Sequence, residues 1–234
     1  MKNSIIALIS LFIITSCSKN SDANLQITGN IKGLQKGTLY LKKLGDSTYV
    51  TLDSMKIDGK SAFESNINLK SPEMLYLFLD RGTSKSGDNS LMFFAEPGKI
   101  NIDTDLESFY SKAKITGSKN NELYESYKKI SSRFNEQQLD LTVEKINAIK
   151  NNQTNLLAGI EEKANVVLKR KYLYAINFAV TNKDYEVSPY IALSEINDAT
   201  IKYLDTIQKA MVPKVAQSKY GVMLTKYVAD RKKE

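Results

Sequence analysis

The chain has 234 residues and a formal net charge of +7, from 33 lysine and arginine residues against 26 aspartate and glutamate residues. It contains no histidine and one cysteine, Cys17. This composition excludes, within these residues, Ser-His-Asp and Cys-His catalytic systems, the commonest transition-metal ligand and any internal disulfide.

Residues 1–16 have the features of an export signal. Lys2 supplies the positive charge, and the apolar run "IIALISLFII" spans only about 10 residues, where a membrane-spanning helix needs roughly 20. The sequence Ile14-Thr15-Ser16-Cys17 has the form of a bacterial lipobox, an apolar residue and two small ones before cysteine. We therefore predict cleavage before Cys17 and lipidation of its thiol; the alternative is a buried free cysteine that happens to follow an apolar run.

Residues 17–24 read as a short polar tether for this lipidated cysteine. Two or three acyl chains anchor a protein stably where one does not. The sequence after Cys17 has no dense acidic cluster, which favours the periplasmic side of the outer membrane. The expected location is the cell envelope of a Gram-negative bacterium.

Residues 25–117 read as short strands separated by turn residues. The expected strands are "LQITGNIKGL", "KGTLYLKKL", "STYVTLDSMKI", "SAFESNINL", "EMLYLFLD", "SLMFFAE", "PGKINIDTD" and "KAKITG". The runs "EMLYLFLD" and "SLMFFAE" are continuously apolar, as in strands buried on both faces. About eight strands at this spacing predict an antiparallel β-sandwich.

The pattern becomes helical after Gly117. Ser118, Asn120 and Asn121 are candidate caps for a first helix. A long helical tract follows, with an interruption expected near "NNQTN" or Gly159, then short helices at "SPYIALSEIND" and "TIKYLDTIQKAM". Pro213 is expected to begin the last helix. The tyrosines concentrated here suit helix packing or, alternatively, a groove that faces a partner.

The order of strands before helices predicts an α+β fold, as two packed layers or two small domains. The expected organisation is a signal peptide (1–16), a lipidated tether (17–24), a β-sandwich domain (25–117) and a helical domain (118–234).

The strand half resembles the N-terminal domain of unknown function of Bacteroidetes-type thiol-disulfide interchange lipoproteins. The stretches that carry the likeness are "ITGNIKGLQKGTLYL", "LDSMKIDGKSAF", "FFAEPGKINI" and "ITGSKNNELYESY". The helical stretches "SPYIALSEIND" and "SKYGVMLTKYV" also look like the helical segment of those proteins.

In the proteins that this chain resembles, a thioredoxin-like domain with a Cys-x-x-Cys pair follows the helices. Here no such domain and no second cysteine is present. Thiol-disulfide exchange needs a thiolate to attack a disulfide, so the resemblance carries over no catalytic residue. We expect a protein that is not an enzyme and that uses no cofactor.

Other chemical motifs are weak. "EPGKI" lacks the upstream glycine of a phosphate-binding loop, and a lysine beside a serine, as at 84–86, is uninformative. The carboxylates of "DTDLE" (Asp103, Asp105 and Glu107) lack the loop that a Ca²⁺ site needs. We expect no metal site.

Three short sequences resemble the O-glycosylation sequon of Bacteroidetes-type envelope proteins, Asp followed by Ser or Thr and then an apolar residue or Thr. Their acceptor hydroxyls are on Ser47, Ser54 and Thr206. The competing interpretation is ordinary turn chemistry, in which Asp-Ser pairs are common.

Two functional hypotheses follow. The first is a non-enzymatic envelope lipoprotein, a binding or scaffold module that contacts another envelope protein or a surface ligand through the loop at residues 81–89. The second is an accessory protein that docks a separate exported thioredoxin-like oxidoreductase. A hydrolase with an unrecognised carboxylate site is a third possibility. The lysines and arginines are scattered opposite acidic residues, so nucleic acid is not an expected partner.

Overall fold

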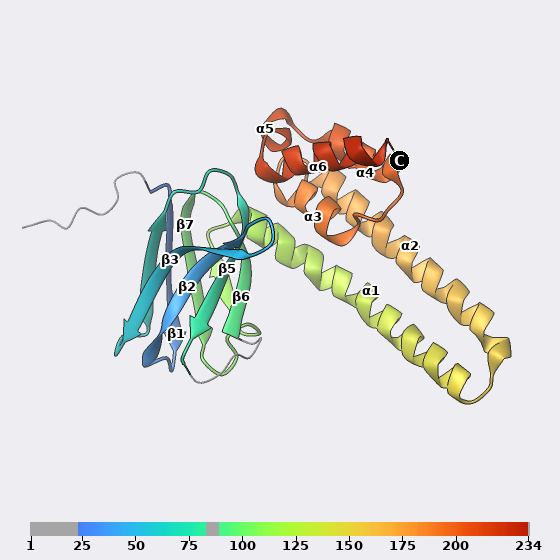
Figure 1. The fold of residues 1–234 in the computed structure, drawn as a ribbon, viewed down its shortest axis with the longest axis horizontal. Coiled ribbons are helices and arrows are strands. Elements are labelled where there is room, and N and C mark those ends of the chain that lie inside the picture. Colours follow the sequence, from blue (N-terminus) through green and yellow to red (C-terminus); the bar gives the residue numbers. More distant parts are fainter. Residues whose placement is uncertain (1–22, 83–88, 234) are drawn as a thin grey trace, which may run out of the picture.

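The computed structural model describes residues 23–82 and 89–233. A two-sheet β-sandwich comes first, and helices occupy the C-terminal half (Figure 1). This is the predicted α+β arrangement. None of the described helices combines the length and the apolar character needed to cross a membrane. Cys17 lies outside the described residues, as do residues 83–88 of the loop predicted to make contacts.

The described residues form eight strands, close to the predicted positions. They are β1 (Leu25–Lys32), β2 (Lys36–Leu44), β3 (Tyr49–Asp58), β4 (Ala62–Ile67), β5 (Glu73–Asp80), β6 (Ser90–Ala95), β7 (Gly98–Asp105) and β8 (Lys114–Thr116). Sheet A has the order β4-β1-β7-β8, and sheet B has the order β3-β2-β5-β6.

The predicted sandwich is antiparallel except at one pair. Strands β1 and β7 run parallel, with Leu25 opposite Gly98 and Lys32 opposite Asp105. The prediction of a purely antiparallel sandwich was therefore wrong at this pair. The chain leaves sheet B after β6 and enters sheet A directly as β7, beside β1, at the end of the sheet where β1 also begins.

Alternation along each strand builds the sandwich core. Successive side chains of a strand point to opposite faces, so every second residue of β1, β2, β5 and β7 enters the space between the sheets. Leu39, Leu75, Leu77 and Ile102 are completely buried there. Burying side chains of this size contributes about 1.5–3 kcal/mol each.

The helical half contains two long helices and several short ones. Its elements are α1 (Lys119–Lys150), the 3₁₀ turn η2 (Thr154–Leu156), α2 (Leu157–Thr181), α3 (Val187–Glu195), α4 (Ile201–Ala210), α5 (Pro213–Ala216) and α6 (Lys219–Arg231). Ser118 caps α1, since its Oγ accepts from the Asn121 amide at 3.0 Å. The long tract breaks at "NNQTN", as predicted, and Gly159 lies inside α2.

The prediction of one last helix from Pro213 was wrong. The chain forms α5, turns at Gln217 and Ser218, and begins α6 at Lys219. Ser218 caps α6: its Oγ accepts from the Gly221 amide at 3.3 Å and donates to the Val215 carbonyl at 2.6 Å. A side chain on Gly221 would collide with that carbonyl, because its Cβ would lie 2.0 Å from the oxygen.

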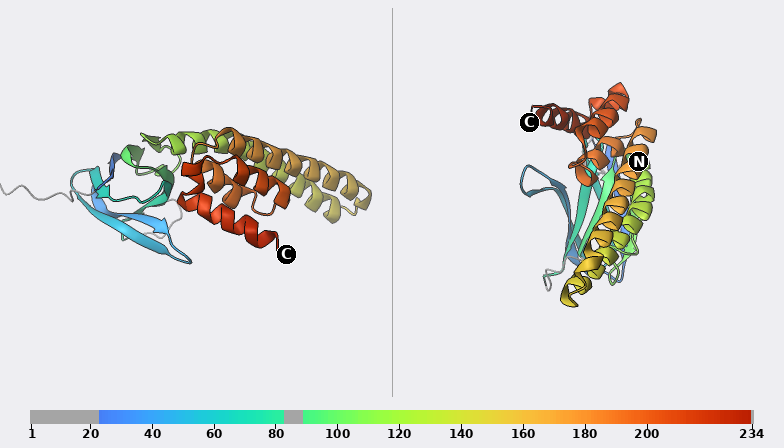
Figure 2. Two further views of the ribbon diagram at one scale, coloured as in Figure 1. Left: turned by 90° about the horizontal axis from the view of Figure 1, so that it is seen from above. Right: turned by 90° about the vertical axis from the view of Figure 1, so that its right-hand side faces the viewer.

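The helices cover one end of the outer face of sheet B. Met74 on β5 and Phe94 on β6 point away from the sandwich core and are buried in a second core with α1, α2, α3, α4 and α6. Strands β5 and β6 are therefore buried on both faces at this end, as predicted. The two views in Figure 2 show the helices joined to one side of the sandwich.

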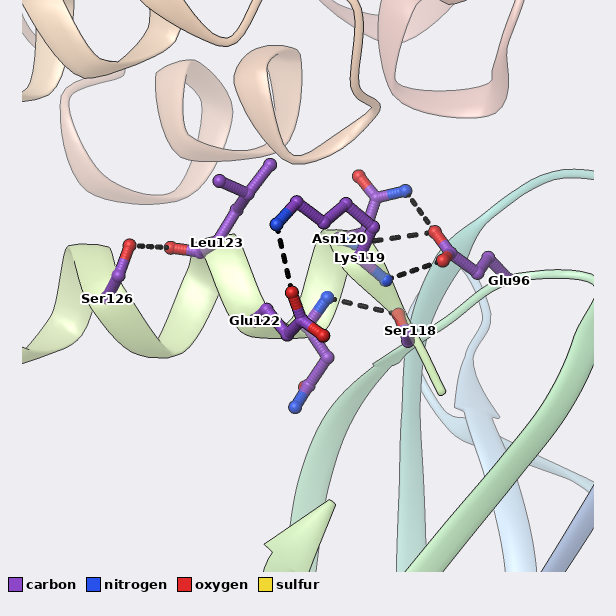
Figure 3. A network of polar contacts seen from close by, with 8 residues as sticks. Glu96, Ser118, Lys119, Asn120, Glu122, Leu123 and Ser126 are labelled. Atoms are coloured by element: carbon purple, nitrogen blue, oxygen red, sulfur yellow. Dashed lines mark hydrogen bonds and ion pairs between the residues drawn. The ribbon is translucent and has the colours of Figure 1, made fainter. Parts of the chain in front are cut away.

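A polar network joins the two halves where α1 begins (Figure 3). Glu96, just after β6, accepts from the backbone amides of Lys119 (2.6 Å) and Asn120 (3.3 Å). A carboxylate at this position satisfies free amides and complements the helix dipole. The Asn120 amide group also donates to Glu96 (2.6 Å) and Glu186 (3.0 Å), and its oxygen accepts from the Val187 amide (2.8 Å).

Helix side chains also complete the hydrogen bonds of sheet B. Asn121 accepts from the Phe94 amide on the free edge of β6 at 2.9 Å. The Tyr220 hydroxyl accepts from the Met74 amide, beyond the last residue pair of β2 with β5, at 3.0 Å. Helix side chains therefore supply the hydrogen-bond acceptors for these two buried backbone amides of sheet B.

Replacing Asn120 by alanine should lower the free energy of unfolding by about 2 to 3 kcal/mol. The change leaves the Glu186 carboxylate and the Val187 amide buried without this partner, and unsatisfied buried groups carry their full desolvation cost. Urea unfolding checks this against Asn147→Ala, an exposed position on the same helix where we expect a change within about 0.5 kcal/mol. Equal stability of the two variants would contradict the role given to Asn120.

Candidate functional site

The outer face of sheet B carries a cluster of aromatic side chains that the helices leave uncovered. Tyr40 and Lys42 of β2 alternate with core leucines, as do Tyr76 and Phe78 of β5. The strand register pairs Tyr40 with Phe78 and Lys42 with Tyr76. Directly opposed residues project on the same side, so these four side chains lie together. With Tyr49 of β3 we call them the aromatic face.

A β-bulge brings Tyr49 to this face. The register of β2 with β3 shifts between Leu41 and Lys42, so that Lys42 pairs with Thr51 and Leu44 with Tyr49. An extra residue in one strand reverses which side chains point outward. Without the bulge, Val50 would point outward in place of Tyr49.

The rings pack in edge-to-face geometry. The ring centroid of Tyr49 lies 4.9 Å from that of Tyr76 and 5.1 Å from that of Phe78, at interplanar angles of 73° and 71°. Such aromatic pairs contribute about 0.5–1.5 kcal/mol beyond the area that they bury. Tyr49 nonetheless remains 48% exposed. It is held in place and still open to solvent.

Lys42 adds a positive charge to the aromatic face. Its Nζ lies 4.8 Å from the ring centroid of Phe78 and 5.2 Å from that of Tyr40. Both distances are within the range of cation–π attraction. The ammonium group is thereby held beside the Tyr40 and Phe78 rings.

Tyr76 joins the aromatic face to the helical core. Burial raises the pKa of its phenol to about 12, and the neighbouring phenols of Tyr190 and Tyr49 add to the shift. On the helical side, Tyr190 packs against Phe94 at 5.6 Å and Tyr220 at 5.0 Å between centroids. The tyrosines of the helical half therefore pack in a core, which agrees with the first interpretation of their abundance.

The chemistry available at the aromatic face is recognition by stacking and hydrogen bonding. It offers aromatic carbon, three phenolic hydroxyls and one ammonium group, which suit contact with a partner that has both apolar and polar surface. Aromatic residues of this kind are enriched at protein interfaces.

The three predicted glycosylation acceptors are all exposed. Ser47 lies in the turn between β2 and β3, next to the aromatic face. Ser54, on β3, pairs with Tyr40 and so projects on the same outer surface. Thr206 lies on α4, and its hydroxyl donates to the Lys202 carbonyl at 2.8 Å. Whether they carry glycans stays a prediction.

The carboxylates of "DTDLE" do not converge. Asp103 accepts from the Asn101 side chain at 2.7 Å, and Asp105 accepts from the Ser108 amide at 2.8 Å and pairs with Lys112 at 3.2 Å. Among residues 23–82 and 89–233, no three acidic, histidine or cysteine side chains are grouped as a metal site would require.

Sequence reasoning missed the aromatic face. "EMLYLFLD" looks buried on both faces throughout, but Phe78 and Tyr76 are only partly covered. The available signal was the spacing of Tyr40 and Lys42 and of Tyr76 and Phe78, each two residues apart. The displacement of Tyr49 by the bulge has no comparable signature in the sequence.

Comparison with known proteins finds one family model that matches the sandwich. Residues 25–124 match the model of the family described as "Domain of unknown function (DUF4369)". No curated protein matches the chain. The matched range extends beyond the strands into α1 and includes Glu96, Asn120 and Asn121, which join the two halves.

The aromatic face gives a pH dependence that can be measured. The folded-state pKa of Tyr76 is raised from its ordinary value of 10.0 to about 12, so its contribution to stability is complete below pH 10 and is lost as the pH rises through 12. Tyr76→Phe keeps the aromatic ring and removes the hydroxyl group that titrates. In urea unfolding between pH 10 and pH 12, the variant should lose stability less steeply than the wild type; equal slopes would contradict the burial of this phenol.

Proposed function

We propose that this chain is a non-enzymatic binding or scaffold module of the bacterial cell envelope, held at the membrane through lipid on Cys17. Its ligand contact is the aromatic face. The observation that carries the proposal is the exposed, pre-packed ring of Tyr49 beside Tyr76 and Phe78 on a rigid sheet.

The geometry of the aromatic face supports a binding role. Tyrosine supplies a large contact area with few rotatable bonds, and tyrosine is enriched among the residues that dominate binding energies. Tyr49 is already held by two ring contacts, so little side-chain freedom is lost when a partner covers it.

The described titratable groups support a non-catalytic role. The clearly raised tyrosine pKa values belong to packed phenols, with burial as the largest cause, as at Tyr124 and Tyr220. The lowered carboxyl pKa values at Asp205 and Glu161 come first from hydrogen bonds to lysines on the surface. These pKa shifts are caused by the packing of phenols and by ion pairs on the surface, and both causes also act outside active sites.

The N-terminal sequence supports the anchor. The lipobox at Ile14–Cys17 supplies the acceptor thiol, and the seven residues 18–24 reach at most about 25 Å when extended. Leu25 begins β1 beside Gly98 of β7, at the end of the sandwich where Glu96 contacts the first residues of α1. In a lipidated chain the tether would therefore hold the junction between the sandwich and the helices near the membrane.

The family likeness supports an envelope role for the same domain. The stretches within residues 25–124 that resemble thiol-disulfide interchange lipoproteins lie in the matched domain of unknown function. A partner with a thioredoxin-like domain would make this chain the accessory protein of the second hypothesis. The identity of the partner separates the two roles.

The proposal is tested by crosslinking in intact cells, followed by purification and mass spectrometry. Tyr49→Ser should reduce recovery of a specific partner at least about tenfold, because it removes a central aromatic contact. Tyr110→Ser is the matched control, since Tyr110 is a 52% exposed tyrosine outside the aromatic face. Unchanged partners for Tyr49→Ser would exclude the aromatic face as the contact.

The same cells test the anchor. The Cys17→Ala variant should no longer be found in the membrane fraction, and it should not incorporate labelled fatty acid. A variant that stays membrane-bound would contradict lipidation at Cys17.

A further inference from the structure

The distal parts of α1 and α2 form an arm that projects from the rest of the molecule. We define the arm as residues 137–173, comprising the end of α1, η2 and the beginning of α2. Figure 1 shows it extending away from the sandwich and from α3–α6. The two helices are held together by ties such as Gln138 to the Ala164 carbonyl (2.7 Å) and Lys145 to Glu161 (2.8 Å).

Exposed apolar side chains are concentrated on the arm. Fourteen large apolar side chains of the described residues are more than a third exposed, and eight of them belong to this short segment. They are Leu139, Val143, Ile146, Ile149, Leu156, Val166, Leu168 and Leu173. Such a concentration exceeds the single scattered apolar side chains of an ordinary surface, and one of the eight, Val166, lines a groove on the arm.

One face of the arm is hollowed. A groove of about 630 Å³ runs between α1 and α2, lined by Leu141, Val166, Val167 and Gly159. Its rim is charged and carries both signs; the rim residues are Asp140, Glu162, Lys163 and Arg170. A Cβ on Gly159 would meet no atom within 4 Å, so this position is open and carries no side chain that a partner would have to avoid.

The α2 side of the groove is complementary to itself. Gly159 and Val166 lie at equal distances on either side of the point between residues 162 and 163. Glu162 and Lys163 flank the same point. An antiparallel copy of α2 centred there would place Val166 opposite the open position at Gly159 and Lys163 opposite Glu162, and both contacts would occur twice. A two-fold interface requires this reciprocity.

We infer that the groove of the arm binds the same groove of a second copy of this chain, as an antiparallel two-fold dimer. The two helical hairpins then form a four-helix bundle, in which each hairpin supplies the layer that the other lacks. The mixed charges of the rim support a second copy, because an acidic partner would meet Glu162 and Asp140 and a basic partner would meet Lys163 and Arg170. The dimer is independent of the aromatic face, on sheet B.

The first test is the oligomeric state of residues 17–234 carrying Cys17→Ala, so that no acyl chain drives association. Sedimentation velocity over a range of concentrations should show a dimer. Val166→Glu should weaken dimerisation at least tenfold, since it puts a charge into the groove. Leu168→Glu is the matched control, because Leu168 is similarly exposed (38% against 43%) and does not line the groove; it should dimerise like the wild type.

A charge exchange tests the two-fold pairing itself. Glu162→Lys and Lys163→Glu should each weaken the dimer, since each creates two like-charge contacts. The double variant should restore it, because the exchanged charges again face each other. Helix content measured by circular dichroism shows whether each variant is folded.

Several results would overturn the inference. They are a monomer at every concentration, a dimer that Val166→Glu leaves intact, or a double variant no better than the single ones. A monomer that binds lipid vesicles through the arm would assign the groove to a membrane surface instead.

Discussion

The structure depends on the hydrogen bonds that helix side chains make to sheet B and to the turn after it. Edge strands present unpaired backbone groups, and buried backbone donors must be satisfied. Here Asn121 accepts from the Phe94 amide on the free edge of β6, and Tyr220 accepts from the Met74 amide beyond the last residue pair of β2 with β5. In return, Glu96 caps the first amides of α1. The sandwich and the helical half therefore each satisfy buried backbone amides of the other.

These bonds also decide which surface stays open. They hold the helices over Met74 and Phe94, so the second core forms at one end of the outer face of sheet B. Farther along β5, Phe78 and its neighbours lie beyond the helices. The aromatic face is thus the uncovered continuation of a face whose other end is buried, and Tyr76 lies at the boundary.

The polar junction has a consequence for specificity. Apolar surfaces alone can pack in several orientations, whereas the Asn120 amide uses both its donor and its acceptor groups on fixed partners, Glu96, Glu186 and Val187. A fully satisfied buried network favours one arrangement over its competitors. The orientation of the arm relative to the sandwich follows from this geometry.

Much of the fold could be predicted from local patterns. Alternation in stretches such as residues 36–44 and the change to helical periodicity after Gly117 gave the strands, the long helices and the position of Ser118 as a cap. These features depend on neighbours within a few residues, which the sequence displays directly.

The remainder depends on contacts between distant residues. Nothing local to Glu96 indicates that it reaches Asn120, and the break before α6 depends on Ser218 and on the close approach of Gly221 to Val215. The outward position of Tyr49 follows from a bulge opposite Leu41 and Lys42. No local pattern in the sequence therefore indicates that this phenol is exposed.

The two halves supply each other's hydrogen-bond partners and should therefore unfold together. Native-state hydrogen exchange measured in increasing urea detects such joint unfolding. The amides of Met74 and Phe94 should exchange with the same free energy, and the same dependence on urea, as buried amides of α3 and α6. Protection of Met74 and Phe94 that persists after the helices have exchanged would contradict this joint unfolding.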